Sequence, residues 1–165
     1  MKHKVIWSCL CILLCLSLTA CSAELNLEEG ASYISDELDL DIKSGKVLTA
    51  WDEHGGFHGD GTAYAVLGFS DSSVLEQIEN SDDWNPFPLD DTVTILVYGT
   101  DGAGPYLTDE NQEPLLPKIR NGYYLLIDRQ EDQEEPDMLK RYSMNFTLAI
   151  YDTDTDRLYY CEEDT

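Results

Sequence analysis

The sequence is poor in basic residues and in histidine. Its 165 residues include 10 lysines and arginines, 33 aspartates and glutamates and 3 histidines, for a formal net charge of −23. A surface this acidic repels phosphate groups, so the composition excludes nucleic acid and anionic lipid headgroups as favourable partners. A basic protein, a basic peptide or a cation suits it better. High negative charge alone also keeps a protein soluble beside an anionic cell wall.

Cysteine is scarce beyond the N-terminus. Cys9, Cys11, Cys15 and Cys21 all precede residue 22, and Cys161 is the fifth and last. A single remaining cysteine excludes an intramolecular disulfide, so the fold must depend on its hydrophobic core. We expect Cys161, in the strand-like run 157–163, to be a small buried apolar residue instead of a reactive thiol.

Long hydrophobic runs are missing as well. The longest, Val5 to Leu18, is shorter than the ~20 residues that a membrane span requires. It follows a basic start and precedes Leu18-Thr19-Ala20-Cys21, as in a secretory signal. That ending resembles the lipobox of bacterial lipoproteins, in which the cysteine thiol receives a diacylglyceryl group. The alternatives are an ordinary signal peptide with a chance cysteine and an uncut membrane helix.

The lipobox sets the expected organisation of the chain. Residues 1–20 would be the signal peptide, residues 21–35 the lipidated Cys21 and a tether, and residues 36–165 a single domain. Two acyl chains anchor a protein stably without a spanning helix. We therefore expect a protein anchored to the cell membrane on its extracytoplasmic face.

Period-two and β-rich patterns dominate the rest of the chain. They predict strands at 36–42, 46–51, 62–69, 92–99, 123–129, 144–152 and 157–164. Residues 100–120 carry glycines and prolines typical of a long loop. A helix is predicted only over residues 72–83, where Val74, Leu75 and Ile78 have helical spacing and Ser73 with Glu76 suggests a capping box. We predict an α+β fold with a mainly antiparallel sheet of about five to seven strands.

The segment 51–64, WDEHGGFHGDGTAY, concentrates histidine and glycine between two predicted strands. His54 and His58, with an oxygen from Asp60 or from Asp52 or Glu53, could bind a divalent metal such as zinc, iron or manganese, with the glycines folding the ligands together. The segment has no HExxH motif and no cysteine pair. The alternative is a hairpin connection whose histidines hydrogen-bond to backbone or carboxylates. The sequence implies no other cofactor.

Aspartates 152, 154 and 156 have the spacing of a calcium loop, but Arg157 stands where such a loop needs glycine and the flanks are β-type. A hairpin turn is the expected structure.

Two tyrosine pairs also lie on predicted strands: Tyr123 with Tyr124, and Tyr159 with Tyr160. Neighbouring residues of a strand face opposite sides of the sheet, so each face carries one tyrosine of each pair. An exposed face with these tyrosines could bind carbohydrate or peptide; the alternative is that loops cover it.

Several phrases of the sequence resemble one family. With the lipobox, HGGFHGDG, PKIRNGYYLLIDR and RYSMNFTLAIYDTDTDRLYY are similar to small uncharacterised surface lipoproteins of clostridial-type Gram-positive bacteria, from about residue 36 onward. The resemblance implies that the protein lies at the cell surface, and it implies no enzymatic reaction. No G-x-S-x-G nucleophile motif occurs, and we expect a non-enzymatic acidic domain with a binding or envelope role. The alternatives are a metal-dependent binding protein or hydrolase, and an immunity-like inhibitor of a basic partner.

Overall fold

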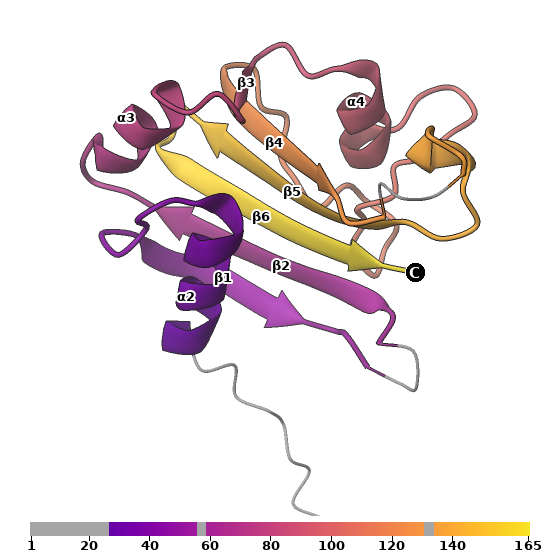
Figure 1. The fold of residues 1–165 in the computed structure, drawn as a ribbon, viewed down its shortest axis with the longest axis horizontal. Coiled ribbons are helices and arrows are strands. Elements are labelled where there is room, and N and C mark those ends of the chain that lie inside the picture. Colours follow the sequence, from indigo (N-terminus) through magenta and orange to yellow (C-terminus); the bar gives the residue numbers. More distant parts are fainter. Residues whose placement is uncertain (1–26, 56–58, 131–133) are drawn as a thin grey trace, which may run out of the picture.

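The domain is built on one six-stranded antiparallel sheet (Figure 1). The computed structural model describes residues 27–55, 59–130 and 134–165. The strands are β1 (Lys46–Asp52), β2 (Gly61–Gly68), β3 (Asn85–Pro86), β4 (Gly122–Asp128), β5 (Asn145–Asp152) and β6 (Arg157–Asp164). Their order is β1-β2-β6-β5-β4-β3, and all neighbours are antiparallel. The α+β prediction is confirmed.

Helices cover both faces of this sheet. The described residues contain α2 (Leu27–Leu38), α3 (Ser73–Glu79), α4 (Asp91–Tyr98) and the short 3-10 helix η1 (Met138–Lys140). Side chains alternate along β6, so Tyr159 and Cys161 pack with α4 and the 100–120 loop, whereas Leu158 and Tyr160 pack with α2 and α3. We call these the α4 face and the α2 face. No helix within the described ranges is both long and apolar enough to cross a bilayer.

The predicted strand over residues 92–99 is wrong, because this segment forms helix α4. The Asp90 side chain caps the helix by accepting a hydrogen bond from the Val93 backbone N–H at 2.7 Å. Val93, Leu96 and Val97 are fully buried, at the three- and four-residue spacing of one helix face. Gly99, at φ 70°, ends the helix. A short apolar run is compatible with either structure until such caps are recognised.

The predicted strand over residues 36–42 and part of the expected tether are also wrong. Helix α2 begins at Leu27, inside the segment assigned to the tether, and buries Ile34 and Leu38 against the sheet. Asp39 adopts a left-handed conformation with φ 49°, which ends the helix. Leu40 and Ile42 then insert into the core from an irregular segment. The alternating apolar residues are therefore buried as the pattern predicts, but they do not form a strand.

The remaining predicted elements agree with the structure. The two hairpins β1–β2 and β5–β6 form, as does β4, and the 100–120 region is a loop. Helix α3 lies within the predicted residues 72–83, and its Val74 and Ile78 are buried. It begins one residue earlier than the expected capping box, since Ser72 is the N-cap and donates its hydroxyl to Glu76 at 2.6 Å.

Candidate ligand-binding cavity

The histidine segment connects β1 to β2, as the hairpin interpretation predicts. The backbone pairing of the hairpin continues one residue beyond the end of β1, because the Glu53 N–H donates to the Thr62 carbonyl of β2 at 3.0 Å. At Gly61 the connection returns so closely that a Cβ atom there would lie 2.5 Å from the Cα of His54. Only glycine fits this crossing without a shift of the backbone.

The metal hypothesis concerned His54, His58 and Asp60. His58 lies outside the described residues, and Asp60 is exposed. Across the described ranges, no three histidine, cysteine, aspartate or glutamate side chains form a group able to hold a metal ion. The structure brings His54 toward Asp52, which the sequence had offered as a candidate ligand, and toward Asp164, which it had not.

His54 lies between Asp52 and Asp164. Its Nδ1 atom is 2.7 Å from Oδ1 of Asp52, and its Nε2 atom is 3.3 Å from Oδ2 of Asp164. The backbone N–H of His54 also donates to Asp52, at 2.8 Å. These contacts join the end of β1 to the end of β6, so the imidazole ring forms one rim of a site on the α2 face.

Arg129 connects this rim to a second group of polar side chains. Its guanidinium donates to Glu162 and, at 2.9 Å, to Asp164. Glu162 also accepts hydrogen bonds from the hydroxyls of Tyr160, at 3.0 Å, and Tyr33, at 3.2 Å. Burial, reinforced by the nearby Glu162 carboxylate, raises the pKa of both tyrosines. Both hydroxyls therefore keep their protons and act as donors.

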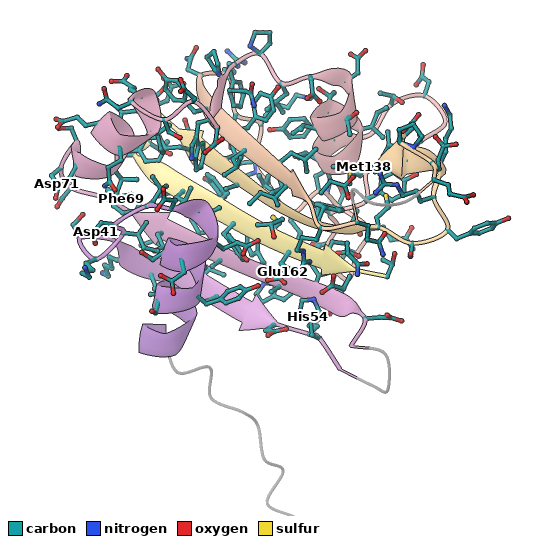
Figure 2. All side chains as sticks on the ribbon, in the orientation of Figure 1. Asp41, His54, Phe69, Asp71, Met138 and Glu162 are labelled. Carbon is teal, nitrogen blue, oxygen red and sulfur yellow. The ribbon has the colours of Figure 1, made fainter. Side chains whose placement is uncertain are left out.

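A cavity of about 490 Å³ lies beside this network, between α2 and strands β1, β2 and β6. Figure 2 shows His54 and Glu162 at the same end of the sheet, next to α2. Small or aliphatic residues make up just over half of the lining: Gly30, Ala31, Ile34, Val47, Ala50, Gly59, Ala63, Ala65 and Leu67. The hollow exists because glycine and alanine occupy positions where larger side chains would fill the space between helix and sheet.

The polar lining gathers at one end of the cavity. Asp52, His54, Glu162 and Asp164 line it there together with Tyr33 and Tyr160. A mostly apolar hollow of a few hundred Å³ with a small number of convergent polar groups is the usual form of a small-molecule site. This arrangement can hold an apolar body against the wall and orient a polar head by hydrogen bonds.

The tyrosine pairs do not form an exposed face of the sheet, which was one of the two alternatives that the sequence left open. Tyr124 and Tyr159 are buried on the α4 face, where α4 and the loop residues Leu107 and Leu116 cover them. Tyr160 is buried on the other face and lines the cavity. Tyr123 is half-buried and donates to Glu79 at 3.2 Å. Both faces of the sheet are covered, and the alternative of covering loops holds on the α4 face.

The other two sequence-based expectations are confirmed. Residues 153–156 form the turn of the β5–β6 hairpin, in which the Asp152 carboxylate accepts from the Asp154 N–H at 2.9 Å and the Thr155 hydroxyl at 2.7 Å. Cys161 is fully buried, and burial raises the pKa of its thiol.

Comparisons of the chain with protein-family models, curated proteins and solved structures gave no significant match. The site therefore rests on its own geometry. Sequence reasoning missed Arg129, Glu162 and Asp164, because the fold alone brings them to the histidine segment. Among 33 acidic residues, no local pattern distinguishes these carboxylates. The alanines and glycine at cavity positions were the one available signal, and it is weak.

Proposed function

We propose that this chain is a membrane-anchored extracytoplasmic lipoprotein whose acidic, non-enzymatic domain binds a small ligand in the cavity under α2. The cavity is the observation that carries the proposal, since it joins an apolar wall to a polar end. The charged groups at that end are engaged with one another, through Arg129 with Glu162 and Asp164. Such pairing orients a ligand and does not supply an activated nucleophile.

The anchoring part of the proposal is supported by the basic start, the apolar run and the Leu-Thr-Ala-Cys ending, and by the lipoprotein resemblance of the later phrases. The wild-type protein should fractionate with membranes, and Cys21→Ala should release it. Cys161→Ala is the matched control, because it removes a cysteine from the domain and should leave the protein with the membrane. Unchanged fractionation of Cys21→Ala would contradict the lipid anchor.

The binding part is tested with a neutral probe. Isothermal titration of the chain from Ser22 onward, which contains every element of the described fold, should show that hexanol binds at one site. The double variant Ala31→Leu with Ala63→Leu fills the hollow from helix and strand, and it should weaken binding about ten-fold or more.

The matched control is Ser32→Leu, which adds the same side chain to α2 at an exposed position outside the cavity lining. It should bind hexanol like the parent. Circular dichroism of the double variant should remain native, since leucine favours helix and both positions face free space. Binding that survives in a folded double variant would place the ligand elsewhere and refute the cavity as the site.

A further inference from the structure

The cavity differs in character from one end to the other. The helix side and the sheet side are lined by Ala31, Ala50 and Ala65, whereas Asp52, Glu162 and Asp164 gather near the ends of β1 and β6. A ligand that matches both parts has an apolar body and a polar head. The proposed function leaves the chemistry of that head open.

The charge of the residues at the polar end disfavours a ligand with an anionic head. Three carboxylates line the polar end, and Arg129 is the cation that contacts them there, through Glu162 and Asp164. The whole chain carries a formal charge of −23. A cavity with low-dielectric walls focuses such a field and attracts cations while it repels carboxylates and phosphates.

The contacts of His54 point the same way. The 2.7 Å separation between Nδ1 and Asp52 requires a proton on Nδ1. In the neutral ring, Nε2 then presents a lone pair toward the carboxylate of Asp164, 3.3 Å away. Within the described part of the chain, Nε2 is buried and has no hydrogen-bond partner. A second ring proton or a bound ammonium group would each bring a donor and a positive charge to this position, and an ammonium group has three N–H donors.

We infer that the cavity binds an amphipathic primary amine, with its alkyl or aryl body against the alanine-lined wall and its ammonium group among Asp52, His54 and Asp164. This inference rests on the proposed function and names the class of ligand for the same site. Charge-assisted hydrogen bonds to two carboxylates would fix the head, and burial of the body would supply most of the affinity.

The test compares three probes of one shape: hexylamine, hexanol and hexanoate, titrated calorimetrically into the chain from Ser22 onward at neutral pH. Hexylamine should bind more tightly than hexanol by a factor of about ten or more, and hexanoate should bind more weakly than either. The double variant Asp52→Asn with Asp164→Asn keeps the shapes of the side chains and should abolish the preference for the amine. The preference is the ratio of the hexylamine affinity to the hexanol affinity, so a loss of affinity common to both probes does not count as loss of the preference.

A matched control removes the same charge elsewhere. Asp82→Asn with Asp101→Asn changes two exposed acids outside the cavity lining, and it should keep the amine preference. Equal binding of hexylamine and hexanol by the parent would overturn the inference and leave the proposed function standing. Loss of the preference in the control as well would also overturn it, since the attraction would then be a property of the whole surface. If none of the three probes binds, the proposed function and the inference fail together.

Discussion

The Nε2 atom of His54 lies 3.3 Å from Oδ2 of Asp164, and this contact joins the β1–β2 connection to the last residues of β6. Asp52 holds the other side of the same ring through Nδ1. The imidazole is therefore fixed by two carboxylates that come from different strands. Its position defines the polar rim of the cavity.

This geometry leads to a prediction for metal removal. Chelation, followed by zinc, manganese or calcium, should shift the melting temperature of the parent no more than that of His54→Ala or His58→Ala, because a surface this acidic binds cations weakly at many places. Differential scanning calorimetry is the measurement. A ligand at 100 times its dissociation constant adds about 2.7 kcal/mol, so a specific site would be visible. A shift that disappears in both variants would restore the histidine metal site.

The contact of α3 with the sheet gives a prediction for stability. Ile78 is 1 % exposed, and Ile78→Asp would bury a carboxylate among apolar side chains, so the domain should unfold or lose several kcal/mol. Leu48→Asp is the control, because Leu48 is 44 % exposed at the bulge of β1, and this variant should stay native. Urea unfolding followed by circular dichroism compares them. A native-like Ile78→Asp variant would contradict the packing of α3.

The ion pair of Asp128 with Arg141 predicts a dependence on pH. Nη1 of Arg141 lies 2.8 Å from Oδ1 of Asp128, and this hydrogen bond lowers the pKa of Asp128 in the folded state. The pair therefore stabilises the fold above the unfolded value of about 3.9, and this contribution is lost as the pH falls through the folded value. Asp128→Asn should be less stable than the parent at neutral pH, and the difference should shrink in acid.

Urea unfolding at a series of pH values measures that difference. Asp82→Asn serves as the control, since Asp82 is exposed, and its stability should follow that of the parent at every pH. A destabilisation of Asp128→Asn that stays constant down to a pH of about 3 would show that the pair with Arg141 does not set the titration of Asp128.

The buried thiol of Cys161 provides a report on unfolding. It is the single cysteine from Ser22 onward and is fully buried, and burial raises its pKa. A thiol reagent should therefore react slowly with the native chain from Ser22 onward and rapidly in urea, with a midpoint equal to that of circular dichroism. Fast labelling without denaturant would show that the centre of β6 opens to solvent in the native state.

The sequence predicts the strands better than the helices, and particular residues explain why. The β5–β6 hairpin combines two β-rich runs with a turn of aspartates and threonines, so its pattern is local and clear. Residues 92–99 carry the same apolar richness in a helix, and the caps Asp90 and Gly99 were the deciding signals. Helix α2 was missed because it lies in an acidic stretch with few apolar residues, of which Ala31, Ile34 and Leu38 share one helix face.

The site was less accessible to sequence analysis than the fold. His54 stood out because histidine is rare here, and the hairpin that places it was predicted. Its partner Asp164 comes from the far end of the chain, and Arg129 follows β4, so their meeting depends on the strand order. That order is a long-range property that no local pattern encodes, because many topologies bury the same strand faces.

The position of β6 has a consequence for when the domain can fold. β6 lies between β2 and β5, so the last strand in the sequence fills the middle of the sheet. Until β6 pairs, no strand of the β1–β2 hairpin is paired with a strand of the β3–β4–β5 portion, and the non-local pairing that joins them is slow to form. Completion of the sheet therefore waits for β6 to pair along both of its edges, and the two portions of the sheet stay uncoupled until that step.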